Sequence, residues 1–404
     1  RKHQVLSGGQ KVAAYLDNAA TTRPCDAATA AMEKALTDIY GNPSSLHLMG
    51  LEAEKAVNEA RANIAAALIR QKLADVKKPE RQLVFTSGGT EANNLAIIGT
   101  AMSKKRFAGG KIILGESEHS SVLECGRRLS EFGFKVVTIP SPRGVWDMEK
   151  YRSELDRSVV LVSAMVVNNE TGALHDVWNI VKLARELAPE ASVHFDAVQA
   201  FCKFPLERFP DADLISVSSH KIYGPKGVGA LYISERILKN GNISPVIFGG
   251  GQEQGLRSGT ENTIGIIGFG AAAKEIGSDI AANAAHFADL YSYLCEKISS
   301  LPEGSVIINE PAVRVKHIVS LTVPKIRSET MLHHLSSHGV FVSSGSACSS
   351  NTRHRSSALS SFGLSDENAD CTIRISFGLY NTHEDIEALI CGLADGISRL
   401  ARKR

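Results

Sequence analysis

The segment SSHKIYGPKG at residues 218–227 decides the fold that we expect for this chain. It follows the apolar run Leu214–Val217 and ends in a turn rich in glycine and proline. Lys221 therefore follows the end of a predicted buried strand, between small polar residues and the turn. In α/β proteins, ligands bind beyond the carboxyl ends of such strands. The position of Lys221 thus predicts an amine at the ligand-binding edge of a sheet.

Apolar runs alternate with helical stretches through about the first 260 residues. Continuous apolar strands that alternate with helices predict a mostly parallel sheet, buried on both faces. The chain is therefore expected to be an α/β protein whose large domain holds a seven-stranded sheet. The strand-like runs are Leu83–Thr86, Lys111–Leu114, Lys135–Ile139, Val159–Val167, Val193–Asp196, Leu214–Val217 and Val228–Ile233.

The glycine run Gly249–Gly251 interrupts this alternation. Beyond it, the alanine-rich stretch Asn262–Ser299 predicts one long helix, followed by shorter strands and a closing helix from about Glu384. We interpret this region as a smaller α+β domain. The predicted large domain covers residues 16–261. The small domain covers residues 1–15 and 262–404 and includes a mobile loop at about 343–362.

The composition narrows the class of protein. A length of 404 residues suggests two domains, and a net charge of +2 gives no reason to expect nucleic acid or a membrane surface as a partner. The seven cysteines form no CxxC pair, so neither a disulfide framework nor a metal site is expected. A reducing, cytoplasmic location fits best. The chain begins at Arg1 without a methionine, so an upstream start and organelle targeting stay open.

Lys221 and Asp196 together point to a coenzyme. A lysine that condenses with an aldehyde and an aspartate that holds a pyridinium nitrogen are what a pyridoxal phosphate (PLP) enzyme most needs. Asp196 alone would be interpreted as a helix N-cap, and Lys221 alone as a solvated loop residue. Lys226 is a local competitor for the lysine role. The combination favours PLP bound at Lys221.

Three segments supply candidate phosphate ligands. Thr86–Glu91 joins a predicted strand to a helix, where Gly89 allows close approach of an anion and Thr90 adds a hydroxyl. Ser218 and His220 flank the lysine and offer further donors. A plain helix cap would explain the first segment alone, but agreement among the segments favours a phosphate site.

Further polar residues follow other strand ends. Gln199 is a candidate to reach the phenolic oxygen of the PLP ring, and Asn169 is a second candidate for that oxygen or for the substrate. His119 follows a strand end, where an imidazole can stack on the ring and shuttle protons near neutral pH. A surface turn histidine is the alternative for His119.

Longer motifs extend these positions over nearly the whole chain. They are YLDNAATT (15–22), YGNPSS (40–45), TSGGTEANN (86–94), NNETG (168–172), SHKIYGPKG (219–227), GGGQE (249–253), RSGTEN (257–262) and GSACSS (345–350). The set resembles fold-type I PLP enzymes, and more closely the cysteine desulfurases, the NifS/IscS-like members of the class-V aminotransferase group. Together the motifs are highly specific, although a fragment such as NPSS is not.

The resemblance implies a role for each matching residue around the coenzyme. Lys221 would carry PLP, Asp196 would pair with its ring nitrogen, and His119 would stack on the ring. Thr90, Ser218 and His220 match phosphate ligands in that family.

The resemblance also implies the reaction and its partners. Arg374 matches the arginine that holds the substrate carboxylate, and Cys348 matches the nucleophile that takes sulfur from L-cysteine, leaving L-alanine and a persulfide. Thr260 matches a threonine that reaches the phosphate of the neighbouring subunit, which implies a homodimer. The sulfur would then pass to an acceptor protein for iron–sulfur cluster or other thio-cofactor synthesis.

Alternatives remain at this stage. A selenocysteine lyase shares the fold and most of the site, and a non-catalytic sulfur-handling scaffold could hold PLP only to stabilise a dimer. The sequence RHR at 353–355 is basic where many relatives have an acidic residue and a proline. It would either dock an acidic partner, favour the Cys348 thiolate, or be simply a solvated loop. Cys125, Cys202 and Cys391 lie in apolar or helical contexts and are expected to serve packing alone.

Overall fold

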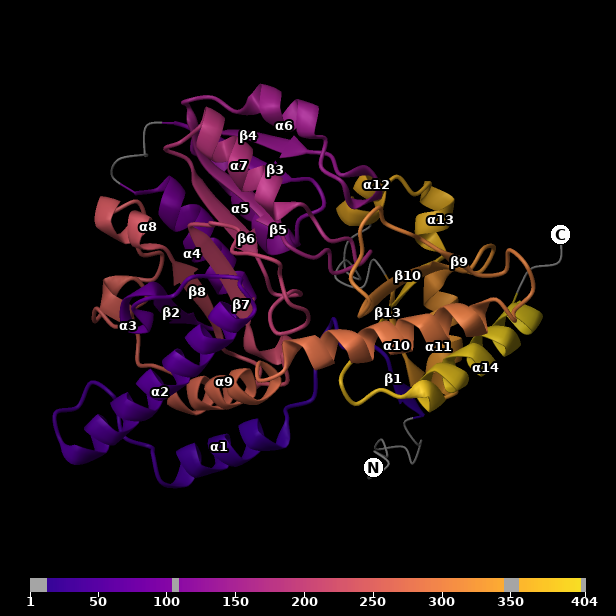
Figure 1. The fold of residues 1–404 in the computed structure, drawn as a ribbon, viewed down its shortest axis with the longest axis horizontal. Helices are drawn as coiled ribbons and strands as arrows, with labels where there is room; N and C mark the ends of the chain where they lie inside the picture. The colour runs from indigo at the N-terminus through magenta and orange to yellow at the C-terminus, as the bar shows by residue number, and fades with distance from the viewer. Residues whose placement is uncertain (1–12, 104–108, 345–355, 401–404) are drawn as a thin grey trace.

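A computed structural model describes residues 13–103, 109–344 and 356–400 of the chain (Figure 1). Two sheets lie in separate halves of the molecule, with the large one on the left of the view and the small one on the right. Cys348 and the basic stretch 353–355 fall outside the described residues.

The large sheet has seven strands in the order β2-β8-β7-β6-β5-β3-β4. Only β8 runs antiparallel to its neighbours, so the predicted mostly parallel sheet is confirmed. The strands are β2 (Leu83–Thr86), β3 (Lys111–Gly115), β4 (Lys135–Ile139), β5 (Val159–Met165), β6 (Ser192–Asp196), β7 (Leu214–Ser218) and β8 (Gly229–Ile233).

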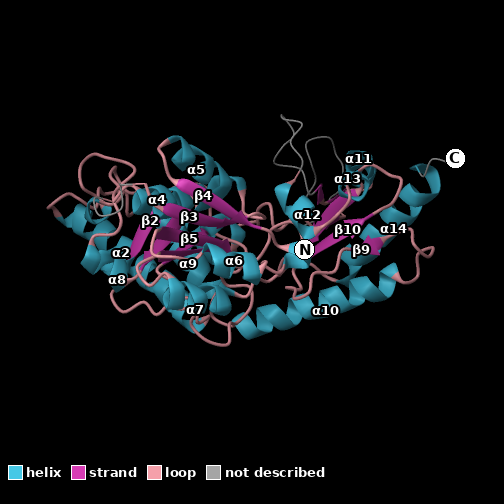
Figure 2. Cartoon of the chain, turned by 90° about the horizontal axis from the view of Figure 1, so that it is seen from above, coloured by secondary structure: helices cyan, strands magenta, loops and turns pink. Residues whose placement is uncertain are grey.

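Helices cover both faces of this sheet (Figure 2). Apolar residues of α4 and α5 pack with β3 and β5 on one face, and residues of α7 and α9 belong to a larger core on the other. Burial on both faces explains why the central strands are rich in apolar residues. Their buried polar residues Ser163, His194 and Ser216 hydrogen-bond one another across the sheet. The helices of this half are α1 (Asp26–Thr37), α2 (Leu48–Arg70), α3 (Pro79–Gln82), α4 (Gly89–Ala101), α5 (Ser120–Glu131), α6 (Met148–Glu154), α7 (Val177–Leu187), α8 (Glu235–Asn240) and α9 (Thr263–Ile276).

The small sheet is antiparallel, in the order β12-β13-β10-β9, and has its own hydrophobic core against α10, α11 and α14. Near the start of the described chain, β1 pairs in parallel with β11. The elements are β1 (Ala14–Tyr15), β9 (Ile307–Ile308), β10 (Ile318–Thr322), β11 (Val340–Phe341), β12 (Ser343–Ser344), β13 (Thr372–Ser376), α10 (Ile280–Ile298), α11 (Ser328–Ser337), α12 (Ser357–Phe362), α13 (Asp366–Asp370) and α14 (His383–Leu400).

The prediction of one helix over Asn262–Ser299 is wrong. The stretch forms two helices, with α9 ending at the C-cap Gly277 and α10 beginning after the N-cap Asp279. The Asp279 side chain accepts a hydrogen bond from the backbone N–H of Ala282, so it caps the second helix. The high alanine content of the stretch made the helix break at Gly277 and Asp279 hard to detect in the sequence.

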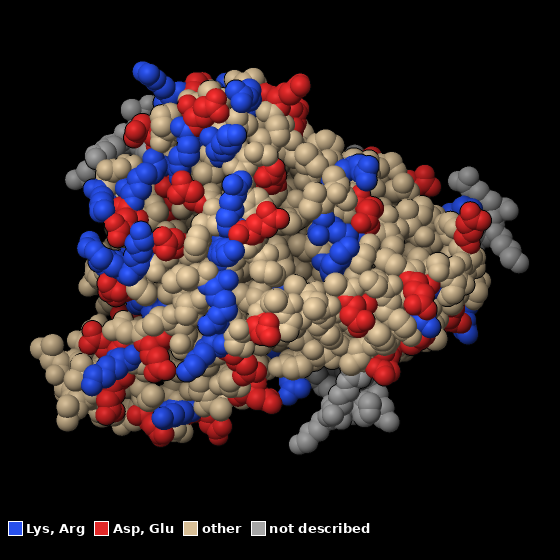
Figure 3. Space-filling view, viewed as in Figure 1, with Lys and Arg blue, Asp and Glu red and all other residues tan. Residues whose placement is uncertain are grey.

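The surface and the helices bear on possible partners. On the face in Figure 3, Lys and Arg side chains are interspersed with Asp and Glu, which agrees with the small net charge. Within the described ranges, none of the helices combines the length and the apolar character that a bilayer crossing requires.

Candidate active site

A cavity of about 440 Å³ lies where the carboxyl ends of the large sheet meet β12 and β13 of the small one. Polar side chains from both sheets line it, which is the arrangement expected of a ligand site in an α/β protein. Its lining includes Ala19, Ala20, Gly89, Thr90, Asn93, His119, Ser121, Asn169, Glu170, Asp196, Gln199, Ser218, His220, Lys221, Ser343 and Arg374.

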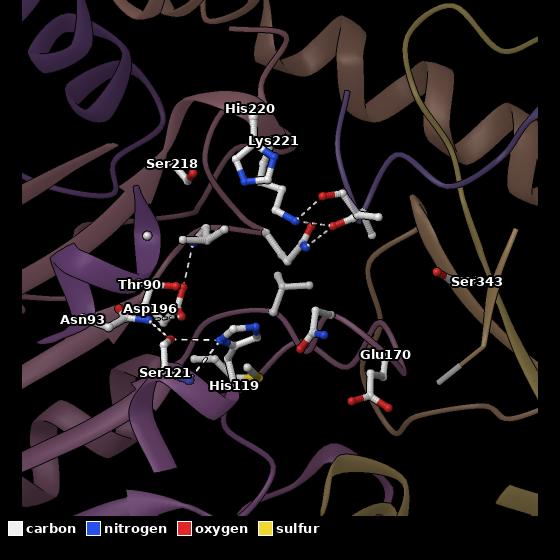
Figure 4. Close-up of a pocket in the computed structure, with 18 of the residues that line it drawn as sticks. Thr90, Asn93, His119, Ser121, Glu170, Asp196, Ser218, His220, Lys221 and Ser343 are labelled. Atoms are coloured by element: carbon white, nitrogen blue, oxygen red, sulfur yellow. Dashed lines mark hydrogen bonds between the residues drawn. The ribbon is translucent and has the colours of Figure 1, made fainter. Parts of the chain in front are cut away.

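Lys221 reaches the cavity from a single 3₁₀ turn, Ser219–Lys221, directly after β7. Its Nζ donates hydrogen bonds to the carbonyl oxygens of Ala19, at 2.7 Å, and Ala20, at 2.6 Å (Figure 4). Those carbonyls belong to the segment that follows β1, so residues near the start of the sequence hold an amine from its middle. The two bonds keep the amine inside the cavity.

Asp196 ends β6, and hydrogen bonds fix both of its carboxylate oxygens. Oδ1 accepts from the backbone N–H of Val198 at 2.9 Å, and Oδ2 accepts from Asn93 Nδ2 at 2.8 Å. The residue is only 6% exposed. Asn93 Nδ2 also donates to Ser121 Oγ at 2.9 Å, so one amide links this carboxylate to the next group of the site.

His119 is the N-cap of α5, and Ser121 orients its ring. The backbone N–H of Ser121 donates to His119 Nδ1 at 3.1 Å, and Ser121 Oγ lies 2.9 Å from the same nitrogen. Because Nδ1 accepts, the proton of the neutral ring resides on Nε2. Burial lowers the pKa of His119; the Asp196 carboxylate opposes this shift and the Lys221 amine adds to it, and the net lowering favours the neutral form.

The part of the cavity that is lined by Ser218, Gly89 and Thr90 contains a hydroxyl donor without a protein partner. Ser218 is 1% exposed, and its Oγ is buried without a hydrogen bond. Gly89 opens α4 here, and a Cβ at that position would lie 2.8 Å from Val198 Cγ2. Thr90 follows in the first turn and is exposed to the cavity. The orphaned hydroxyl beside a helix N-terminus suits an anionic group.

His220 adjoins the same part of the cavity. Its Nδ1 lies 3.2 Å from Thr21 Oγ1. Burial, with a smaller contribution from Lys221, lowers the pKa of His220 to about 4. The ring is therefore neutral near pH 7 and able to donate one N–H to a ligand.

Arg374 extends into the cavity from β13 on the small-sheet side. Its Nη2 donates to Asp17 Oδ1 at 2.8 Å, and its Nη1 donates to the Asn169 carbonyl at 3.0 Å. Nε is buried without a hydrogen-bond partner. Ser343 pairs with Arg374 across the sheet and lines the cavity beside it. The guanidinium is thus held in place at the wall of the cavity.

Glu170 lines the cavity close to Arg374. Its Oε2 accepts a hydrogen bond from Ser356 Oγ at 2.6 Å, which connects the cavity to the residue that precedes α12. Burial raises the pKa of Glu170 to about 7, although the Ser356 bond and Arg374 oppose that shift. The folded chain therefore holds this proton more tightly than the unfolded chain does.

This raised pKa gives a stability prediction. A carboxyl with a raised folded-state pKa favours folding below its ordinary pKa, and the benefit is lost as pH rises through about 7. Glu170→Gln should therefore melt like the parent at pH 5 and a few °C higher at pH 8, because the shift corresponds to at most about 3 kcal/mol. Thermal melts of both proteins across this range would check it; equal melting temperatures at pH 8 would contradict it.

The structure brings most of the sequence-predicted residues together. Lys221, Asp196, His119, Ser218, His220, Gly89, Thr90, Gln199, Asn169 and Arg374 all line this one cavity. Gln199 uses its Nε2 to donate to the Ala19 carbonyl at 2.8 Å. Thr260 is exposed and does not line the cavity of its own chain. Cys348 lies outside the described residues, although the described flanks Ser344 and Ser356 reach the cavity and Glu170 respectively.

Four residues of the site received no individual role from the sequence. Asn93 and Ser121 orient Asp196 and His119, Asp17 holds Arg374, and Glu170 holds Ser356. Asn93 follows Thr90 by one helical turn, so helical spacing was the one local signal for it. Asp17 meets Arg374 only through tertiary folding.

The cysteines divide by burial. Cys125 and Cys202 are buried, as expected for packing, and burial raises the pKa of each thiol to about 12. Burial also raises the pKa values of Cys25 and Cys371. Cys391 is exposed on α14, so the prediction that it serves packing alone is wrong. A helical context indicated its secondary structure but not which face it occupies.

Comparisons with known proteins agree with this geometry. The family model described as aminotransferase class-V matches residues 14–389. A protein named cysteine desulfurase IscS from Dictyoglomus turgidum is 38% identical, over 92% of this chain and 91% of that relative. A solved structure titled NifS-like protein is 34% identical, with a TM-score of 0.85, covering 96% of this chain and all of that one.

A second solved structure is described as SspA in complex with cysteine. It is 32% identical to this chain, with a TM-score of 0.77, and the match covers 91% of this chain and all of that structure. The fold expected from the sequence is therefore confirmed at the level of the whole chain.

Proposed function

The chain belongs to the cysteine desulfurases of the class-V aminotransferase family, and we propose that it uses pyridoxal phosphate to take sulfur from L-cysteine, leaving L-alanine. One observation carries the proposal. Lys221, Asp196 and Arg374 line a single cavity, although each comes from a different strand end or sheet. The cysteine bound in the SspA relative supports the choice of substrate. Relatives named cysteine desulfurase disfavour the lyase and scaffold alternatives.

The residues present fit the coenzyme. The orphaned Ser218 hydroxyl, the first turn of α4 and His220 would hold the phosphate, and Lys221 would hold the aldehyde carbon. Asp196 would keep the pyridine nitrogen protonated, because its carboxylate is fixed by Asn93 and the Val198 N–H. When bound, PLP supplies an electron sink for negative charge at the substrate α-carbon.

Two groups of the chain are placed to transfer or hold protons in the reaction. Lys221 Nζ, held by the Ala19 and Ala20 carbonyls, can take the α-proton of the substrate once it is released from the coenzyme. His119 stays neutral near pH 7 because burial lowers its pKa, and since Nδ1 accepts from the Ser121 N–H, its Nε2–H is the proton it can donate in a hydrogen bond to the coenzyme or the substrate. Asn93 ties His119, through Ser121, to the same carboxylate that holds the ring nitrogen.

Cys348 is proposed as the sulfur acceptor within the chain. It lies four residues beyond Ser344, which lines the cavity, and four residues of chain span about 14 Å at most. Its thiolate would attack the substrate sulfur, so that an S–S bond forms and the Cβ–S bond breaks. The electron pair left on Cβ takes a proton, which yields alanine, and the persulfide remains on Cys348.

A homodimer is also part of the proposal. Thr260 is exposed and follows Gly259, so it is free to face a second copy. Large apolar side chains at Tyr40, Leu46, Leu48 and Phe248 are between 67% and 105% exposed, which favours burial against another subunit. A scaffold or carrier protein would then receive the sulfur from Cys348.

The function has a direct test by mass spectrometry. After treatment with cysteine, the purified protein should carry 32 Da of added sulfur, which is about one atom per chain, on Cys348. After borohydride reduction, a PLP adduct should map to Lys221. Alanine should accumulate in the same reactions. A protein that yields no alanine and no modified peptide would contradict the proposal.

Arg374 provides a prediction about substrate binding. Arg374→Gln should raise KM for cysteine by about 10- to 100-fold, because a charge-assisted pair with the substrate carboxylate is lost. Cysteamine lacks that carboxylate and provides the control. The parent enzyme should prefer cysteine over cysteamine by a similar factor, and the variant should have lost that preference. A variant that still discriminates against cysteamine as the parent does would rule out this role.

A further inference from the structure

A cluster of two histidines and a carboxylate lies outside the active-site cavity. His334 is on α11, His338 is the C-cap of that helix, and Asp395 is on α14. Residues four apart on a helix face the same side, so both rings are directed toward α14. A search of the described residues for three or more His, Cys, Asp or Glu side chains with all their potential ligand atoms within 4.8 Å of one another finds this cluster.

The distances suit coordination by one small cation. Nε2 of His334 lies 3.2 Å from Asp395 Oδ2, and Nε2 of His338 lies 3.6 Å from the same oxygen. Zinc–nitrogen and zinc–oxygen bonds of about 2.0–2.1 Å in a tetrahedron separate neighbouring ligand atoms by about 3.3 Å. The two histidine–carboxylate separations therefore match those between ligands of a tetrahedral metal ion, and the potential ligand atoms of all three residues lie within 4.8 Å of one another.

Two of the three donor atoms lack a hydrogen-bond partner in the described part of the chain, and their contacts become ion pairs only when a histidine is protonated. His334 Nε2 and Asp395 Oδ2 are shielded from solvent, yet neither has a hydrogen-bond partner. They approach to 3.2 Å without the angles of a hydrogen bond, so their bonding directions do not meet each other. Buried polar atoms without partners are uncommon and call for an explanation. A cation between them would satisfy both.

Neighbouring groups fix the donors in the form that binds metal. His338 Nδ1 lies 2.9 Å from the His334 carbonyl, which can only accept, so Nδ1 carries the proton and Nε2 keeps its lone pair. Arg399 Nε lies 2.7 Å from Asp395 Oδ1 and so leaves Oδ2 available. Outer contacts of this kind accompany most protein metal ligands.

Gly396 lets the two helices approach closely at the cluster. A Cβ at that position would lie 3.0 Å from Cδ2 of His334 and 2.9 Å from Cε of Met331. The absence of a side chain at 396 therefore keeps Asp395 within reach of both imidazoles.

We propose that His334, His338 and Asp395 bind a divalent cation of the zinc class, with water as a fourth ligand. Two imidazoles and one carboxylate suit zinc better than calcium or magnesium, which prefer oxygen. The ion would fasten the C-terminal helix α14 to α11. Since α11 leads through β11 to β12 at the cavity, it would also brace the small-sheet side of the active site.

The test is zinc binding to the chelator-treated, PLP-loaded protein in a Cys348→Ala background, which removes a competing thiolate. Competition with a chromophoric chelator should reveal one zinc site per chain. His334→Gln and Asp395→Asn should each weaken that site at least about tenfold. The exposed neighbour His333, changed to Gln, is the matched control and should bind zinc like the parent. Unchanged affinity in both cluster variants would overturn the proposal.

A second measurement separates metal binding from misfolding. Zinc should raise the melting temperature of the parent and of His333→Gln, because a ligand that binds only the folded state stabilises it. The cluster variants should melt near the metal-free parent, with no rise on zinc addition. If His334→Gln does not fold, His338→Gln replaces it, since that side chain is 44% exposed. A zinc-dependent rise in His338→Gln or Asp395→Asn equal to that of the parent would also refute the site.

Discussion

Replacing Lys221 with alanine is expected to lower alanine production from cysteine by at least about a thousandfold, since the change removes both the covalent anchor for the coenzyme and a proton-transfer group. Lys221 Nζ lies inside the cavity, on the carbonyls of Ala19 and Ala20, and the cavity also contains Asp196 and Arg374. Chromatographic measurement of alanine, with peptide mapping after borohydride reduction, would check the result.

Lys226 is the matched control for this experiment. It lies in the same loop but is exposed and does not line the cavity. Lys226→Ala should therefore retain near-parental turnover and the borohydride-trapped adduct at Lys221. The assignment of the coenzyme lysine would be wrong if Lys221→Ala kept both the visible absorbance of bound PLP and its alanine production. It would also be wrong if the adduct mapped to Lys226.

Most of the large sheet could be predicted because strands that are buried on both faces form short, largely apolar runs in the sequence. Every residue of β3, β6, β7 and β8 is buried, and β3, β7 and β8 are mostly apolar in sequence, whereas β6 contains the polar residues Ser192, His194 and Asp196. The direction of β8 could not be read in the same way. It runs antiparallel to β7, and composition carries no information about strand direction.

The site could be predicted where a residue follows a strand end, and not where its partner is distant. Asp196 and Lys221 stand directly after apolar runs, which marks them in the sequence alone. The hydrogen bond from Arg374 to Asp17 joins residues near opposite ends of the chain, and no local sequence pattern predicts it. The raised pKa of Glu170 likewise depends on burial that only the folded chain creates.

Cys348→Ala is expected to reduce sulfide and persulfide formation from cysteine to background, a loss of at least about a thousandfold, while the PLP adduct at Lys221 persists. The reason is chemical. The Cβ–S bond breaks only if a nucleophile accepts the sulfur, and burial raises the pKa values of Cys25, Cys125, Cys202 and Cys371. Thiols held protonated are poor nucleophiles.

Cys391 provides the matched control, because it is an exposed cysteine on α14 that does not line the cavity. Cys391→Ala should retain full sulfur transfer, and the persulfide should map to Cys348 in that variant as in the parent. Selenocysteine gives a second comparison, since its carbon–selenium bond is weaker and a lyase could cleave it without a protein thiol. Cysteine turnover that survived Cys348→Ala would place the sulfur acceptor elsewhere and remove the persulfide step, although the coenzyme assignment at Lys221 would still stand.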